Sequence, residues 1–160
     1  KDIRGEKVEP RIEVEIDLLI KGYIPNEYVP ELNQRLDLYR RIQLAADIND
    51  CMNLSREMID RFGPYPEPIE KLLALLKIRM FCQKLHIKQV HLKNGKVLLT
   101  LLPSTPVKPE WLTAILDERL KMLSEFQIGI LLDRKGWKAD LNLVSDYLQR
   151  LLKLLNINKA

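Results

Sequence analysis

Residues that metal sites and reactive thiol sites depend on are scarce in this chain. Its 160 residues include only two cysteines and two histidines. Cys51 and Cys82 lie far apart and lack the spacing of a zinc motif. Two thiols in a chain of this length are typical of a reducing compartment, where they are usually small buried groups. We therefore expect a cytoplasmic protein that has no metal site.

Features of nucleotide-binding and membrane proteins are also missing. None of the six glycines stands in a Gly-x-Gly arrangement or precedes a Lys-Ser or Lys-Thr pair, although phosphate loops need such glycines. No apolar run approaches the roughly 20 residues that cross a bilayer. The charged start, Lys1 to Arg11, lacks the apolar region of a signal peptide. We expect no nucleotide site, no cofactor and no membrane contact.

What is present suits a single globular domain. Apolar residues make up 46% and charged residues 30%, which is neither disordered nor fibrous in character. The net charge of +4 is unevenly spread: residues 1–80 sum to −2 and residues 81–160 to +6. A basic half can attract nucleic acid or an acidic partner, and it can equally be a solvated lysine-rich surface. Because only Arg134 and Lys135 adjoin among the basic residues of this second half, the solvated surface is the favoured interpretation.

The first half predicts one strand followed by three helices. Strict alternation from Ile12 to Leu18 predicts a half-buried strand. A helix follows from Pro30 to Ala46, and a second helix ends at Gly63, where a left-handed residue costs least and the next residue is proline. A third helix carries Ile69 to Met80 and has apolar residues on more than one stripe, so we expect it to be well buried.

The second half predicts two hairpins separated by a helix. Asn94-Gly95 accepts the positive φ values of a type I′ turn between strands 90–93 and 96–100. A helix is predicted from Pro109, a strand over 126–132, a returning strand over 137–141, and a last helix from Asn142. The predicted order is β-ααα-ββ-α-ββ-α. Such grouping indicates an α+β fold, in which grouped helices pack on a small, mostly antiparallel sheet.

Two constellations have the residue types that chemistry or recognition requires. Cys82 precedes His86 by four residues, so a Cys–His dyad is conceivable, but the apolar neighbours favour an inert buried thiol. Glu13, Glu15 and Asp17 share one strand face at steps of about 6.6 Å, too wide for one chelated metal. Two interpretations stay open for these carboxylates: pairing with basic residues on a neighbouring strand, or contact with a partner.

Three short stretches carry a family resemblance. They are Ile24-Pro25-x-x-Tyr28, then Arg35-Leu36-x-x-Tyr39-Arg40-Arg41, then Glu57-Met58-Ile59-Asp60-Arg61-Phe62-Gly63-Pro64-x-Pro66. In this order and at these separations, the chain resembles the C-terminal regulatory domain of the transcription-repair coupling factor family (Mfd) over roughly residues 10–155. The residues we assign to this structural motif are Arg35, Tyr39, Asp60, Arg61, Phe62, Gly63 and Pro64.

The resemblance implies a regulatory role without catalysis. Proteins of that family use ATP to displace stalled RNA polymerase from damaged DNA and then recruit the excision-repair protein UvrA. Their motor motifs lie upstream, so residues 1–10 are interpreted as a linker from the motor and residues 11–160 as a single α+β C-terminal domain. In that family the domain packs on the protein's own N-terminal UvrA-like module and masks its UvrA-binding surface. Glu13, Glu15 and Asp17 are the first candidates for this contact, and basic residues after position 84 are the second.

One departure and two rival functions complete the sequence-based picture. Where the family commonly has Leu-Gly-Ile, this chain has Leu85-His86-Ile87, and histidine tolerates the left-handed conformation expected at that helix end. The first rival is a DNA-binding accessory domain in which Trp137, beside Lys135 and Lys138, is a stacking platform. Against it, Trp137 is expected to pack in the sheet. The second rival is an independent enzyme that uses Cys82 and His86.

Overall fold

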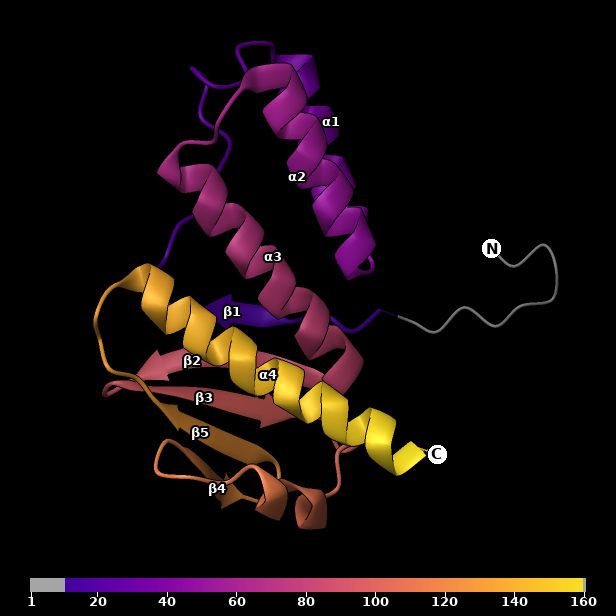
Figure 1. Cartoon of the computed structure of the whole chain (residues 1–160), viewed down its shortest axis with the longest axis vertical. Helices are drawn as coiled ribbons and strands as arrows, with labels where there is room; N and C mark the ends of the chain where they lie inside the picture. Colours follow the sequence, from indigo (N-terminus) through magenta and orange to yellow (C-terminus); the bar gives the residue numbers. More distant parts are fainter. Residues whose placement is uncertain (1–10, 160) are drawn as a thin grey trace, which may run out of the picture.

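A computed structural model of the chain describes residues 11–159 (Figure 1). In chain order the elements are β1 (Glu15–Asp17), α1 (Leu32–Leu44), α2 (Ile48–Phe62), α3 (Glu67–Leu85), β2 (Ile87–Lys93), β3 (Lys96–Leu101), the 3₁₀ helix η1 (Pro109–Ala114), β4 (Leu120–Ser124), β5 (Gln127–Leu131) and α4 (Trp137–Lys159). Helices are grouped apart from the strands, which confirms the predicted α+β class. The predicted linker over residues 1–10 lies outside the described residues. None of the helices described over 11–159 is both long and apolar enough to cross a bilayer.

The five strands form one sheet in the order β1-β2-β3-β5-β4. Only β1 runs parallel to its neighbour, and the other three pairs are antiparallel, as the prediction of a mostly antiparallel sheet requires. The β2–β3 hairpin turns at Asn94 and Gly95, whose φ values of 53° and 77° are those the type I′ turn demands. The central strands contribute fully buried side chains such as Val90, Val97 and Ile128 to the core.

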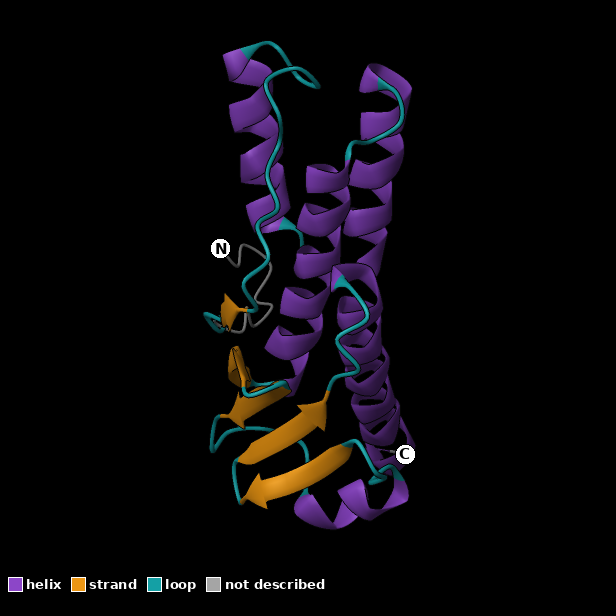
Figure 2. Ribbon diagram, turned by 90° about the vertical axis from the view of Figure 1, so that its left-hand side faces the viewer, coloured by secondary structure: helices purple, strands orange, loops and turns teal. Residues whose placement is uncertain are grey.

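Helix α3 lies between two hydrophobic cores. On one side its Phe81, Cys82 and Leu85 pack with the sheet and α4. On the other side its Ile69 and Leu76 pack with α1 and α2, which form a helical unit above the sheet (Figures 1 and 2). A helix that buries two sides needs apolar residues on more than one stripe, so the sequence prediction for this segment is confirmed. The two cores make α3 the connection between the helical unit and the sheet.

The end of α3 explains the substitution of histidine for glycine. His86 has φ 55° and ψ 46°, which is the left-handed conformation, and its backbone N–H donates to the carbonyl groups of the last helical turn. The chain then enters β2 directly at Ile87, a fully buried residue. The expected left-handed helix end is therefore present without glycine. Its cost is modest because a single left-handed residue is strained by only about 1–2 kcal/mol.

The second hairpin differs from the prediction. The helix predicted from Pro109 is the short η1, and the strand that forms a hairpin with β5 is β4, which precedes it in the chain. Asp117 explains the early end of the helix: its carboxylate accepts the N–H groups of Arg119 and Leu120, both at 2.8 Å, and the Tyr147 hydroxyl at 2.6 Å. This turn releases Leu120 to pair with Ile130.

The prediction of a returning strand over 137–141 was also wrong, because these residues begin α4. Trp137, Leu141, Val144 and Leu148 follow the helical period, and the last three are buried in the main core. Gly136 precedes the helix with φ 123°, and its carbonyl accepts the N–H of Asp140 at 3.0 Å. The short alternation at Trp137 to Leu141 is thus the first turn of a helix. Its true start is five residues before the predicted Asn142.

Candidate functional site: a charged helix face and an acidic strand

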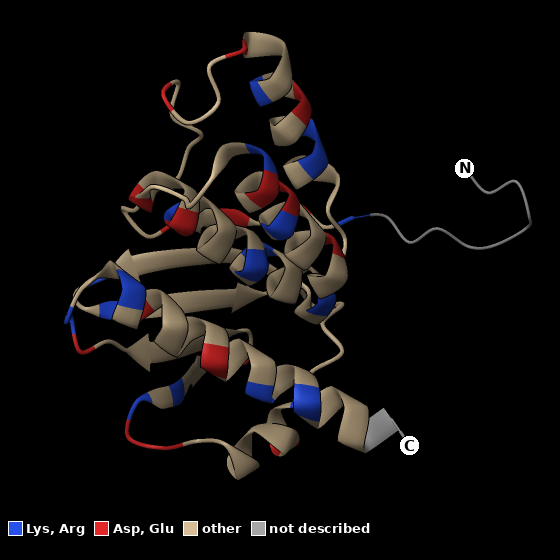
Figure 3. Ribbon diagram, turned by 45° about the horizontal axis from the view of Figure 1, so that its top comes forward, with Lys and Arg blue, Asp and Glu red and all other residues tan. Residues whose placement is uncertain are grey.

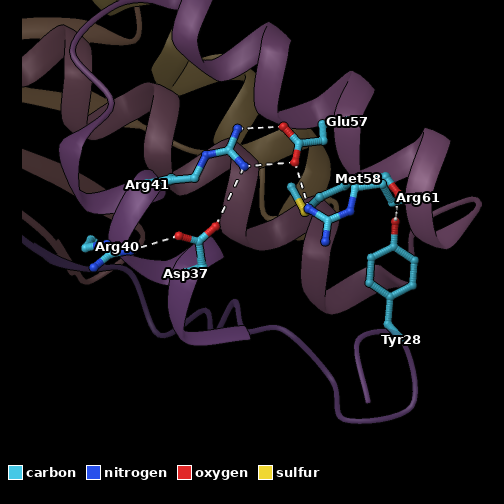
Figure 4. A network of polar contacts seen from close by, with 7 residues as sticks. All are labelled: Tyr28, Asp37, Arg40, Arg41, Glu57, Met58 and Arg61. Carbon is cyan, nitrogen blue, oxygen red and sulfur yellow. Dashed lines mark hydrogen bonds and ion pairs between the residues drawn. The ribbon is translucent and has the colours of Figure 1, made fainter. Parts of the chain in front are cut away.

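The family motif folds into one charged face on α1 and α2 (Figure 4). Arg41 of α1 donates two hydrogen bonds to the Glu57 carboxylate of α2, at 2.9 and 2.6 Å. Arg61, one helical turn after Glu57, donates a third at 2.7 Å. The hydrogen bonds from Arg41, and next the single bond from Arg61, lower the pKa of Glu57 to about 2. This carboxylate is therefore ionised at every physiological pH, and it ties the two helices together.

Helix α1 extends the same ionic network. Asp37 lies 2.9 Å from the Arg40 guanidinium and 4.0 Å from that of Arg41, so four charged side chains alternate in sign from Arg40 to Glu57. Figure 3 shows that acidic and basic positions are interleaved along the upper helices. The 2.6–2.9 Å bonds have the geometry of charge-assisted pairs. A partly exposed network of this kind presents both signs of charge to a partner.

Tyr28 ties the entry loop to the end of α2. Its hydroxyl lies 2.7 Å from the carbonyl oxygen of Gly63 and 3.1 Å from that of Met58, and donates its proton between them. The Tyr28 ring contacts the Phe62 ring at a centroid distance of 5.7 Å. The Arg61 guanidinium lies over the Phe62 ring, 4.9 Å from its centroid. The Tyr28 and Phe62 positions of the motif therefore stabilise one loop–helix junction.

The remaining motif residues hold the loop that precedes α1. Arg35 donates to the carbonyl groups of Val29 and Pro30 at 2.7 and 2.9 Å. The Tyr39 hydroxyl accepts the backbone N–H of Ile24 at 2.8 Å. These contacts give polar groups of the loop a hydrogen-bond partner, which is a physical reason for Arg35 and Tyr39 at these positions. Tyr39 is itself 38% exposed, less enclosed than a core packing residue.

Gly63 and Pro64 end α2 as predicted, but with a different backbone geometry. Gly63 has φ 90° and ψ −172°, a region that is almost exclusive to glycine, instead of the ordinary left-handed conformation. Asp60 sits one turn before this end on the solvent side of α2. It is exposed, and it forms no ion pair with any residue in the described part of the chain. Asp60 is thus an unpaired negative charge beside the Glu57 network.

The three acidic residues of the first strand lie elsewhere. The strand predicted from Ile12 to Leu18 is shorter, since β1 covers only Glu15–Asp17. Glu15 and Asp17 are exposed on this edge strand, and Glu13 is exposed two residues before it. Within residues 11–159, Glu15 alone of the three has a side-chain hydrogen bond, from Gln89 at 3.5 Å. One interpretation was that these carboxylates pair with basic residues of a neighbouring strand. Among residues 11–159 none of the three forms an ion pair. The structure therefore separates two charged surfaces, the α1–α2 face and the acidic strand.

Sequence reasoning missed Glu57 as the centre of the network. Its ion pair with Arg41 joins residues 16 apart, so no local spacing indicates it. A partial signal was present, because Glu57 and Arg61 are four apart on α2 and Asp37 and Arg41 are four apart on α1, and such pairs meet on a helix surface.

The Cys82 thiol is unsuited to nucleophilic chemistry. Cys82 is fully buried, and burial raises the pKa of its thiol to about 12. The nearby His86 ring is engaged elsewhere, with its Nδ1 atom 2.9 Å from the Ser104 hydroxyl. A thiol that stays protonated at neutral pH is a small apolar group in the core.

Trp137 begins α4 and is not in a strand of the sheet, but it is partly buried and packs against the core that the sheet shares with α3 and α4. Its indole N–H donates to the Glu67 carboxylate of α3 at 3.0 Å. The ammonium groups of Lys71 and Lys138 lie 5.4 and 5.8 Å from the ring centroid, within the range of cation–π contacts. Residue 137 thus packs from the first turn of α4 and not from a strand.

Comparison with known proteins identifies this arrangement. The fold matches the crystal structure of the C-terminal domain of a transcription-repair coupling factor with a TM-score of 0.79 at 19% identity, covering 91% of this chain and 96% of the other. Residues 18–112 match the family profile described as the TRCF domain. The fold, which carries the charged α1–α2 face in this chain, is therefore that of a C-terminal domain of this kind. Because the match spans more than half of the chain, this protein belongs to the TRCF domain family.

Relatives with this sequence pattern are much longer proteins. The transcription-repair-coupling factor of Escherichia coli (strain K12) is 30% identical over 107 residues, which is 67% of this chain and 9% of the relative. That of Bacillus subtilis (strain 168) is 32% identical over 91 residues, 57% of this chain and 8% of the relative. That of Buchnera aphidicola is 25% identical over 143 residues, 88% of this chain and 18% of the relative. The chain thus spans less than a fifth of each of these relatives.

Proposed function

We propose that this chain is a non-catalytic regulatory domain of a transcription-repair coupling factor and that it acts as an autoinhibitory clamp. The parent protein would be an ATP-dependent DNA translocase of the cytoplasm that displaces stalled RNA polymerase and recruits UvrA. In the closed state this domain would cover the UvrA-binding surface of the parent's N-terminal UvrA-like module. Membership of the TRCF domain family supports the assignment. The absence of a competent thiol at Cys82 argues against the rival of an independent enzyme.

The charged α1–α2 face is the docking surface that the observations favour. Docking would be a property of the whole family, so its surface should lie within the family match. The match over residues 18–112 includes the α1–α2 face and excludes Glu13, Glu15 and Asp17. Asp60 supplies a carboxylate that has no ion pair within residues 11–159, and Glu57 is held ionised beside it. A basic surface on the N-terminal module would complement these two groups. The acidic strand is the alternative surface.

Such a clamp is a two-state equilibrium between a docked and a released domain. A bias of about 3 kcal/mol towards the docked state would hide the partner site in more than 99% of molecules. An interface rich in charged groups suits this size of bias, because polar contacts between domains are moderate in strength and can reopen. Ion pairs at the edge of an interface also respond to salt, so release should become easier at high ionic strength.

The decisive experiment is a competition. The 160-residue chain is mixed with the N-terminal module of its parent, binding is measured by calorimetry, and UvrA is then added. We expect the chain and UvrA to exclude each other. A stable complex of all three proteins would refute the clamp.

Charge reversal locates the docking surface. Asp60→Lys should weaken binding to the module at least fivefold, whereas Glu15→Lys on the acidic strand and Glu110→Lys on η1 should leave it unchanged. The opposite order, with loss only in Glu15→Lys, would move the docking surface to the acidic strand. Asp60 and Glu110 are both exposed and without ion pairs in the described part of the chain, so neither change should disturb folding.

The DNA-binding rival is tested with the same protein. Its motivation is the surplus of basic residues after position 80. The stacking platform that it requires is engaged, since Lys71, Lys138 and Glu67 all contact the Trp137 ring. Titration of the chain with a duplex oligonucleotide at several salt concentrations decides the matter. Binding whose logarithm falls linearly with the logarithm of salt concentration would favour DNA over the clamp.

A further inference from the structure

One face of the sheet has no described helix against it. The inner face packs against α3 and α4, as Figure 2 shows, and it carries the buried strand residues. The outer face carries the alternate residues of each strand, many of them polar or charged. Three leucines nevertheless lie on it: Leu98 is half-buried, whereas Leu123 and Leu131 are 47% and 43% exposed. An apolar centre on an otherwise polar sheet face is a feature of interaction surfaces.

Strand register places opposite charges at the two edges of this outer face. Asp17 on β1 pairs in register with His91, His91 with Leu98, Leu98 with Gly129, and Gly129 with Lys121 on β4. This row crosses the whole sheet. Four strand spacings of about 4.8 Å separate its acidic end from its basic end by roughly 19 Å. The leucine at position 98 occupies the middle of the row.

The other charged residues of the outer face lie on several strands. Glu15 and Asp17 are on β1, and Glu13 lies two residues before it, whereas Lys93 is on the neighbouring strand β2 and Lys96 on the middle strand β3. The opposite charges at the two edges of the face are therefore those of the row from Asp17 to Lys121. Gly129 leaves space at the centre, into which Leu123 leans: a Cβ atom at that position would lie 3.0 Å from Leu123 Cδ1.

We propose that the outer sheet face binds a second copy of this chain, face to face. The two copies are related by a two-fold axis that runs parallel to β3, between the two faces and beside Leu98. Rotation about this axis places the β1 edge of each copy against the β4 edge of the other. Because the rotation preserves position along the strands, Asp17 of one copy then meets Lys121 of the other, twice by symmetry. Leu98 meets its own counterpart at the axis. A surface that is acidic at one edge, apolar in the middle and basic at the other edge is complementary to itself in this arrangement.

The size of the face sets the strength of the association. Five strands of about five residues present roughly 400 Å² on each copy, or about 800 Å² in total. Stable interfaces bury more than this, so the dimer is expected to be weak, with a Kd above about 1 µM. The α1–α2 face lies outside the interface. Dimerisation and a clamp that docks through the favoured α1–α2 face therefore use different residues, and the failure of one leaves the other standing.

Sedimentation equilibrium of the full 160-residue chain tests the proposal, over protein concentrations up to about 1 mM. We expect a concentration-dependent dimer that dissociates with added salt. Asp17→Lys and Lys121→Glu should each weaken self-association at least about fivefold, because each substitution turns both Asp17–Lys121 contacts into pairs of like charge. An equimolar mixture of the two variants should associate more strongly than either variant alone, since all cross-pairs in the mixed dimer have opposite charges.

Matched controls separate this arrangement from general electrostatics. Glu110→Lys and Lys138→Glu change the same charges at exposed positions outside the face and should leave self-association unchanged. A chain that stays monomeric at all concentrations overturns the proposal. So does a dimer that is indifferent to the Asp17 and Lys121 variants, or a variant mixture that associates no better than its components. Circular dichroism of each variant confirms that the fold is retained before the comparison is made.

Discussion

The two hydrogen bonds from Arg41 to Glu57 join α1 to α2 across 16 residues of sequence. Arg41 presents both terminal nitrogens to both carboxylate oxygens, which is the planar geometry that arginine favours with carboxylates. Arg61 contacts the same carboxylate from within α2. Glu57 is consequently the residue through which the two helices of the charged face hold one orientation, and several properties of the domain should depend on it.

The free energy of unfolding should decrease as the pH is lowered through a window set by Glu57. Its pKa in the folded state is about 2, against an ordinary value of 4.5, so its contribution is complete above about pH 4.5 and is lost as pH falls towards 2. Because the side chain is partly exposed, solvent screening limits the contribution to about 1 kcal/mol. Urea unfolding at pH 7 and pH 3 should show that the difference between the wild type and Glu57→Gln falls to less than about half at the lower pH. Glu110→Gln serves as the control, and an equal pH dependence in both variants would contradict the role of Glu57.

Removal of the Tyr28 hydroxyl should destabilise the loop–helix junction. Tyr28→Phe keeps the ring contact with Phe62 but leaves the Gly63 and Met58 carbonyl groups without their donor. The free energy of unfolding should fall by about 1–2 kcal/mol. Tyr23→Phe is the matched control, since Tyr23 is half exposed and its hydroxyl has no described hydrogen bond. Denaturation midpoints that agree for the two variants would show that the junction does not depend on the hydroxyl.

Replacement of Gly63 should be costly although space surrounds it. A Cβ atom there would meet no heavy atom within 4 Å, so the cost comes entirely from the backbone conformation at φ 90° and ψ −172°. Gly63→Ala should lower the free energy of unfolding by about 1–3 kcal/mol. Asparagine tolerates the ordinary left-handed conformation but not this one, so Gly63→Asn should be equally destabilised. Thermal unfolding of both variants provides the comparison, and a clear rescue by asparagine would indicate a different backbone geometry.

The two thiols should be inert in the folded protein. Both cysteines are buried, and burial raises the pKa of Cys51 as well as that of Cys82, the latter to about 12. Iodoacetamide at pH 8 should therefore label the native chain far more slowly than the chain in denaturant, with both rates read by mass spectrometry. Fast and selective labelling of Cys82 in the native chain would revive the Cys–His hypothesis.

Local patterns predicted those elements that a single segment specifies by itself. Asn94-Gly95 indicated its hairpin because few other residue pairs accept two positive φ values in succession. The apolar residues on several stripes of α3 indicated its double burial. The segment 137–141 was misassigned, because five alternating residues suit a strand as well as the first turn of a helix. Only the packing of Leu141 and Val144 on the core distinguishes the two.

The charged surfaces depended on tertiary structure to a greater degree. Periodicity indicated that Glu13, Glu15 and Asp17 share a face, since side chains in a strand alternate between its two sides. It did not indicate that Lys121 lies at the opposite end of the same register row, because strand order and register join segments about a hundred residues apart. The pairing of Arg41 with Glu57 likewise required the packing of α1 on α2. Sequence spacing acts only over a turn or a strand, whereas contacts between elements are selected by the burial of the whole core.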